Sequence, residues 1–170
     1  ARMQDAWNDT VDAVLAGLEP VKQDQIKAIT AQVQVAARAD DMDALDDITV
    51  DEQAVYEVLF PHLLEAAEPA ARAQQREAEE QGVNVPEWSL TSSTDAVTAS
   101  VGRDLLESVA RVTARLMSAS LVQSAVRTAL RLFGRGNTPE LVTAGVEEHL
   151  EGLTDAQPRE TVGGAVTQAQ

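Results

Sequence analysis

The sequence predicts an all-α protein, an elongated multi-helix assembly with two long helical regions and short C-terminal helices. Apolar residues recur at three- and four-residue steps along most of the chain, which is the spacing of one helix face. Strand-like alternation of apolar and polar residues does not persist anywhere. Hydrophobic residues make up 44% of the 170 residues but aromatic residues only 3%. The apolar content is therefore mostly Ala, Val and Leu, which suits slim helix–helix contacts, and we expect six or seven helices of very uneven length.

The first region, residues 1–82, is acidic and begins with two expected helices. The first helix runs from about Gln4 to Leu18, and Gly17 and Pro20 mark its end. Pro20 suits the first turn of the second helix, where its missing N–H does no harm. The apolar faces of the two helices consist of Trp7, Val11, Val14, Leu15 and Leu18, and of Val21, Ile26, Ile29, Val33, Ala36 and Ala37.

An acid-rich segment follows, with six acidic residues from Asp40 to Asp51. It lacks the central glycine and the terminal glutamate of an EF-hand loop, which argues against a calcium site. Met42, Leu45 and Ile48 recur every three residues. This spacing favours a short amphipathic turn with its acids outside.

A long helix should come next, from the capping-box pair Thr49 and Glu52 to about Gln81. Its apolar stripe consists of Val55, Leu59, Leu63, Ala66 and Ala67, broadened by Tyr56 and Phe60. Pro61 and Pro69 each remove a backbone donor and clash with the preceding turn. We therefore expect a kink or break at one of them, and favour Pro69.

Residues 83–94 are expected to form a linker, because they hold Pro86 and a Ser/Thr cluster. The second region, residues 95–170, should be helical, with a long helix from about Thr94 to Phe133. Its apolar residues fit a four/three step and mark one face of the helix: Val97, Val101, Leu105, Val109, Val112 and Leu116, then Val122, Val126, Ala129, Leu130 and Phe133.

The chain should turn at the stretch "FGRGNTPE". We expect Gly134 to end the long helix in a left-handed cap, and Thr138 and Pro139 to start the next helix. Two short helices are expected at about Pro139–Leu150 and Asp155–Gln168, the second of them capped by Thr154.

The net charge is strongly negative and unevenly spread. The formal charge is −15, with 19 acidic and 6 basic residues in 1–90 but 9 and 7 in 91–170. This acidity disfavours non-specific nucleic-acid binding, because such binding depends on basic residues that displace counterions. The sequence has no cysteine, which excludes disulfides and thiolate metal sites. No apolar run approaches the ~20 residues of a membrane span, and we expect neither a membrane partner nor a cofactor.

The arginines of the second region are the candidate partner-binding residues, and they form two sets. Within each set, steps of four or eight residues place the side chains along one drifting stripe of a helix. Three interpretations stay open: ion pairs with the acidic first half, acidic groups on a protein partner, or DNA phosphates. The two sets are Arg103, Arg111 and Arg115, and Arg127, Arg131 and Arg135.

Catalytic residues are hard to assemble from this sequence. His149 follows Glu147 and Glu148, which would be the pair for a hydrolase or a metal site. Adjacent helix residues point in different directions, however. A histidine near a helix C-terminus also suits the helix dipole. We therefore expect no catalytic and no metal-binding residue, and no enzyme activity.

The stretch "ALRLFGRGNTPELVTAGVEEHLEGLTDAQPRETVGGAVTQAQ" resembles the helical part of MuF-like minor head proteins, the head morphogenesis proteins of tailed phages. The shared pattern is a helix ending at Gly134, the start Thr138-Pro139-Glu140, a short helix, and the segment "VGGAVTQAQ". The likeness extends over residues 95–170. The chain begins without methionine and ends in mid-pattern, so we expect it to be a piece of a longer polypeptide, such as the MuF-like part of a capsid maturation protease fusion.

The resemblance implies a structural component of the virion, inside the phage head or at the portal, that is assembled in the host cytoplasm. Such proteins are present in a few copies, bind portal or major capsid protein, and assist head assembly or DNA delivery. The alternative is an acidic internal scaffolding protein of the procapsid. Charge disfavours contact with the packaged DNA.

Overall fold

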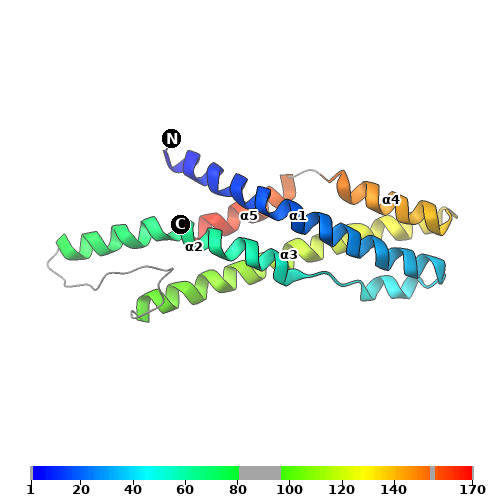
Figure 1. The fold of residues 1–170 in the computed structure, drawn as a ribbon, viewed down its shortest axis with the longest axis horizontal. Coiled ribbons are helices and arrows are strands. Elements are labelled where there is room, and N and C mark those ends of the chain that lie inside the picture. The colour runs from blue at the N-terminus through cyan, green and yellow to red at the C-terminus, as the bar shows by residue number, and fades with distance from the viewer. Residues whose placement is uncertain (1, 81–96, 154–155, 170) are drawn as a thin grey trace.

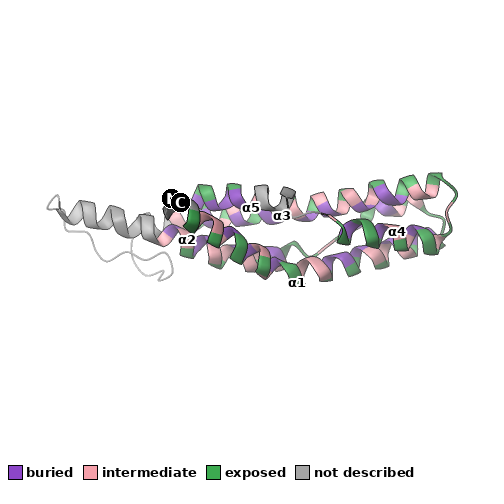
Figure 2. Ribbon diagram, turned by 90° about the horizontal axis from the view of Figure 1, so that it is seen from above, coloured by how far each residue is buried: buried purple, intermediate pink, exposed green. Residues whose placement is uncertain are grey.

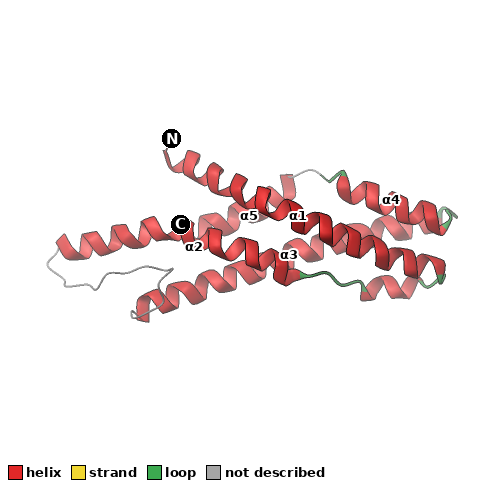
Figure 3. Cartoon of the chain, in the orientation of Figure 1, coloured by secondary structure: helices red, strands yellow, loops and turns green. Residues whose placement is uncertain are grey.

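Five α-helices and one 3-10 helix make up the described part of the chain, and no strand occurs there (Figures 1 and 3). The computed structural model describes residues 2–80, 97–153 and 156–169. The all-α prediction is therefore confirmed, with fewer helices than the six or seven expected. The elements are α1 (Arg2–Arg38), η1 (Met42–Asp47), α2 (Glu52–Glu80), α3 (Val97–Gly134), α4 (Pro139–Glu151) and α5 (Ala156–Ala169).

The helices run up, down, up and down along one long axis (Figure 1). Helices α1 and α3 are continuous over 37 and 38 residues, which corresponds to about 55 Å each at a rise of 1.5 Å per residue. The returning limbs are interrupted: η1 precedes α2 in one, and α4 precedes α5 in the other. The bundle thus consists of two uninterrupted helices, α1 and α3, and two limbs of two elements each, η1 with α2 and α4 with α5.

The buried residues form two separate cores, which divide the bundle into two lobes (Figure 2). The terminal lobe joins the first half of α1, the first half of α3, α2 and α5; the distal lobe joins the second halves of α1 and α3, η1 and α4. Each core draws on both expected regions, residues 1–82 and 95–170. Fully buried examples are Val11, Val14, Leu59, Leu63, Val162 and Val166 in the terminal lobe, and Ile26, Ile29, Val33, Val142, Val146 and Leu150 in the distal lobe.

The expected helix boundary at Gly17 and Pro20 is wrong, because α1 continues through both residues. Pro20 is exposed. The part of α1 before it packs in the core of the terminal lobe, and the part after it packs in the core of the distal lobe. That burial offsets the backbone hydrogen bond that proline cannot make. Gly17 serves a packing role: a Cβ at this position would lie 3.0 Å from Val58 Cγ1, so its absence lets α1 approach α2 closely.

The segment between α1 and α2 follows the predicted turn but not the predicted cap. Leu45 and Ile48 are buried while the acidic residues are exposed, which confirms the amphipathic turn. The cap of α2 is Asp51, whose Oδ1 accepts a hydrogen bond from the Ala54 N–H at 3.2 Å. Thr49 lies two residues before this cap, where Gln32 of α1 donates to its carbonyl at 2.7 Å and accepts from its N–H at 3.0 Å.

Helix α2 continues through Pro61 and Pro69, so the alternative of a break at one of them is wrong. Pro61 lies on the exposed side, and Leu59 and Leu63, two positions before and after it, are completely buried. Packing of this face keeps the helix intact across the proline. The expected linker at 83–94 and the cap Thr154 lie outside the described residues.

The turn between α3 and α4 begins at Gly134, as predicted, but its left-handed residue is Gly136. Gly136 has φ +79° and donates its N–H to Phe133 O at 2.9 Å. Gly134 needs no such conformation because it is still helical. Thr138 caps α4 as predicted, accepting from the Leu141 N–H at 3.3 Å, and Pro139 occupies the first turn.

A buried glutamine ties the two lobes together at the waist of the bundle. Gln25 is 7% exposed, and its Nε2 donates to Ser118 Oγ on α3 at 3.1 Å and to Asp51 O before α2 at 3.2 Å. A buried amide is stable only when its hydrogen bonds are made. The three elements that meet at the waist are thereby fixed in register.

Candidate protein-binding surface

Most of the fully buried residues of α3 are small. Ala110, Ala114, Ala125 and Ala129 are at most 1% exposed, and Thr113, Ser118 and Thr128 are also buried. Leu106 and Leu121 are the large members of this inner face. Small side chains at the contact let the neighbouring helices lie close to α3.

The opposite face of α3 carries large apolar side chains in solvent. Leu105, Val112, Leu116 and Leu130 are 62, 53, 57 and 47% exposed. At 100° per residue these four lie within roughly 40° of one another around the helix, opposite the alanines. An apolar face is ordinarily buried, so the four/three pattern of the sequence marks a helix correctly but its residues lie mainly on the outside.

This outer face continues over nine positions with steps of four and three residues. We call it the outer seam: Leu105, Val109, Val112, Leu116, Ala119, Gln123, Val126, Leu130 and Phe133. None of the nine is buried. Seven are apolar and larger than alanine. Four of these are exposed, while Val109, Val126 and Phe133 are partly buried against the cores, and Ala119 and Gln123 separate the two apolar stretches. Large apolar side chains exposed in line are of the kind that marks a protein contact.

The sequence contained one signal for this arrangement. Beside the stripe of large residues, α3 holds a second periodic series of alanines at positions 110, 114, 125 and 129. A helix with two apolar faces can bury both only if a partner covers the second one. Periodicity could therefore have indicated an outer contact, although not which of the two faces would form it.

The structure separates the predicted arginines into two groups. Arg111 makes intramolecular contacts. It forms an ion pair with Glu107 of α3 at 3.3 Å, and its guanidinium lies over the Tyr56 ring of α2, 4.2 Å from the ring centroid. Arg103 lies over the Phe60 ring at 5.4 Å. These two arginines thus contact the acidic first region through aromatic rings.

The other four arginines, Arg115, Arg127, Arg131 and Arg135, are exposed. None of them makes an ion pair within the part of the chain that the structure describes. Arg115 and Arg127 lie beside the outer seam on opposite sides, about 80° and 40° from its centre line, and Arg131 lies about 80° away on the side of Arg127. Arg135 lies beyond the end of α3 in the turn.

The surroundings of the seam also lack acidic residues along the chain. Between Glu107 and Glu140 the sequence has five arginines and neither Asp nor Glu, although the whole chain holds 28 acidic residues. Along α3 itself the outer seam thus has basic and no acidic neighbours after Glu107, while Glu19 and Lys22 of α1 line the cavity that the seam borders.

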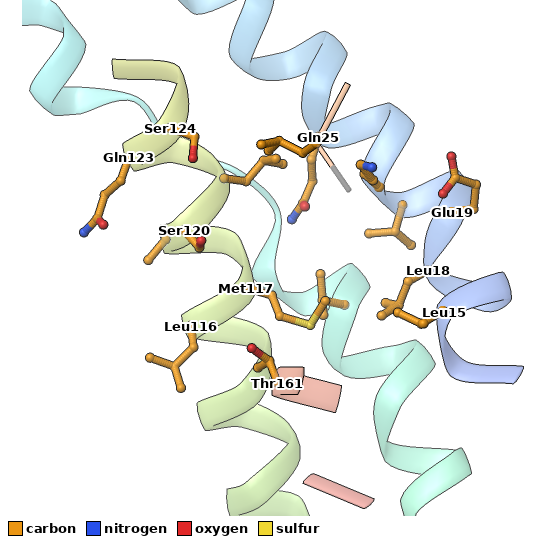
Figure 4. A pocket seen from close by; sticks show the side chains of 16 residues that line it. Leu15, Leu18, Glu19, Gln25, Leu116, Met117, Ser120, Gln123, Ser124 and Thr161 are labelled. Atoms are coloured by element: carbon orange, nitrogen blue, oxygen red, sulfur yellow. The ribbon is translucent and has the colours of Figure 1, made fainter. Parts of the chain in front are cut away.

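A cavity of about 450 Å³ opens at the waist, between α1 and α3. Figure 4 shows Met117 pointing toward α1, whereas Leu116 and Gln123 point away from it. The cavity is lined by apolar residues such as Leu18 and Leu121, and its rim includes Leu116, Ala119 and Gln123 of the seam. The cavity therefore borders the middle of the outer seam at its least bulky position, Ala119.

The histidine considered for catalysis lies at the end of α4 that is nearer the waist, because Leu153 lines both the waist cavity and the depression beside His149. His149 is exposed in the last turn of α4, beside an open depression of about 370 Å³ that also borders Glu148. Glu147, Glu148 and Glu151 are all exposed as well. Within the described residues, no cluster of three or more His, Asp or Glu side chains is placed to hold a metal ion.

Comparisons with protein-family models, with curated proteins and with solved structures give no match. Of the helices in the described ranges, none combines the length and hydropathy needed to cross a bilayer.

Proposed function

We propose that this chain is a helical protein-binding module that acts through the outer seam of α3 and does not catalyse a reaction. The exposed seam carries the proposal. Leu105, Val112 and Leu116 each leave more than half of their surface in solvent, in line, on a rigid helix of the bundle. Covering such side chains with a partner is favourable, at roughly 25 cal/mol per Å² of apolar surface.

The partner that we propose is the portal or the major capsid protein of a tailed phage, as for a minor head component inside the virion. The support is the resemblance to MuF-like proteins over residues 95–170, a range that contains the whole outer seam. An elongated bundle with one long contact face suits a part that bridges larger assemblies. Arg115, Arg127 and Arg131 would meet acidic groups of that partner.

Internal scaffolding is the second candidate, and the net charge of −15 is the observation that favours it. A strongly acidic protein is repelled by packaged DNA and would leave the shell before the genome enters. Hydrolysis by His149 has weaker support, because the carboxylates of Glu147, Glu148 and Glu151 are all exposed to solvent. DNA binding by the arginines would leave the apolar seam without a role.

Co-expression with the portal and capsid proteins of the phage tests the main proposal. We expect the chain to co-purify with one of them, and the double variant Val112→Ser/Leu116→Ser to lose that binding. Val35→Ser is the matched control, because Val35 is 70% exposed on α1 and lies outside the seam. Recovery of neither protein by the wild-type chain would contradict the proposal. Mass spectrometry of mature particles separates the two candidates, since a scaffold should be absent from them.

A further inference from the structure

We propose that the outer seam binds one acidic amphipathic helix of the partner, which lies along α3 as in a coiled coil. This inference rests on the proposed function, in which the seam is the protein contact. It adds the shape and the charge of the element that the seam recognises.

The spacing of the seam fits a helix. Its nine positions alternate steps of four and three residues, the heptad pattern of two helices that pack knobs into holes. From Leu105 to Leu130 the seam is about 38 Å long. A straight apolar strip of that length matches the apolar stripe of one partner helix of about four heptads.

The charges beside the seam specify an acidic partner. In the heptad register, Arg115 and Arg127 occupy the two flanking positions that face the charged margins of a bound helix. Neither makes an ion pair within the described residues. Carboxylates on both margins of the partner helix would pair with them, while lysines would be repelled.

The same charges disfavour a second copy of this chain as the occupant. Pairing α3 with another α3 would place arginine and serine margins against each other, because α3 has no acidic residue after Glu107. Each copy would also carry a net charge of −15. A nucleic acid fits no better, since it would leave Leu105, Val112 and Leu116 against a polar backbone.

The hollow at the waist adds a size preference at the centre of the seam. Ala119 and Gln123 border the cavity of about 450 Å³. A large apolar side chain of the partner at the middle heptad would enter this space, as anchor residues do at the centre of other interfaces.

Two synthetic peptides test this inference on the full chain. Each has about four heptads with Leu at the apolar positions; one carries Glu at both flanking positions and the other Lys. Like charges keep each peptide from pairing with itself. Titrations at about 0.15 M salt limit the influence of distant charges, because the Debye length is then about 8 Å.

We expect the Glu peptide to bind at least roughly tenfold more tightly than the Lys peptide, through ion pairs gained with one and repulsion met with the other. The variant Arg115→Gln/Arg127→Gln should lose this preference, and the control Arg38→Gln, on α1, should keep it. Val112→Ser/Leu116→Ser should bind neither peptide. Circular dichroism confirms that the variants fold, as expected for exposed positions.

Equal or tighter binding of the Lys peptide would overturn the inference, as would an unchanged preference in the double arginine variant. A wild-type dimer in sedimentation analysis that Val112→Ser/Leu116→Ser makes monomeric would also overturn it, and would assign the seam to a second copy. The proposed function is tested separately. If the two peptides bound equally well but the seam variant still lost portal or capsid binding, the proposed function would stand and only the acidic-helix inference would fail.

Discussion

Leu105 and Leu106 are neighbours in sequence and share one helix, yet 62% of Leu105 is exposed and only 5% of Leu106. They represent the two faces of α3. The inner face packs alanines against the bundle, where α3 contacts α1, α2, α4, α5 and η1, while the outer face presents larger side chains to solvent. Side-chain size therefore did not decide which face is buried.

The difference teaches that burial of α3 follows the geometry of its neighbours. Alanines allow close approach of α1, α2, α4 and α5, and the close packing of many atoms compensates for their small size. Leucines and valines on the outer face add apolar area that the monomer leaves unused. That unused area is what a binding partner can cover.

The largest expected effect comes from truncating the two adjacent leucines. Leu106→Ala should lower the free energy of unfolding by about 2–5 kcal/mol, because it leaves a hole in the terminal lobe. Leu105→Ala should change it by less than about 0.5 kcal/mol, since this side chain has few contacts to lose. Urea denaturation followed by circular dichroism measures both values. Similar losses in the two variants would mean that the outer face is buried in solution.

The next effect comes from enlarging one alanine on each face. Ala125→Leu should cost about 1–3 kcal/mol, because Ala125 is completely buried in the distal lobe and extra methyl groups force its neighbours apart. Ala119→Leu should be close to neutral, as Ala119 is exposed at the rim of the waist cavity. Thermal unfolding of the two variants compares them directly. A stable Ala125→Leu protein would contradict tight packing of the inner face.

The smallest effect extends the comparison to two adjacent glycines of α5. A Cβ on Gly163 would lie 2.6 Å from Trp7 Cζ2, so Gly163→Ala must displace the indole. The indole N–H donates to Thr167 Oγ1 at 3.1 Å. We therefore expect the free energy of unfolding to fall by about 1 kcal/mol. Gly164 has no atom within 4 Å of such a Cβ, and Gly164→Ala should stabilise by about 0.5–1 kcal/mol through helix propensity. The sign of the difference in melting temperature tests this pair. Equal shifts would show that Trp7 does not pack on α5.

Local patterns predicted most of the fold. The three- and four-residue steps placed α2, α3, α4 and α5 close to their observed bounds, and Thr138-Pro139 correctly marked the start of α4. These features depend on neighbouring residues in one helix or cap, so the sequence carries them directly.

The errors concern residues whose role depends on distant partners. Proline and glycine near position 20 predicted a break, but two cores hold α1 straight through it. Asp51 caps α2 in place of Thr49, whose backbone is bound by Gln32, a residue of another helix. The candidate arginines were identified by spacing, but the structure assigned Arg111 to Tyr56 and left Arg115 and Arg127 beside the seam.

The sequence by itself thus determined that the chain is helical, where most helices begin and end, and that its arginines gather in the second region. Only the tertiary structure decided which face of α3 is buried. Periodicity reports that a helix has apolar faces, whereas burial depends on which surfaces of other helices reach them. For α3 those surfaces meet the alanines together with Leu106 and Leu121, and Leu105, Leu116 and Leu130 stay exposed.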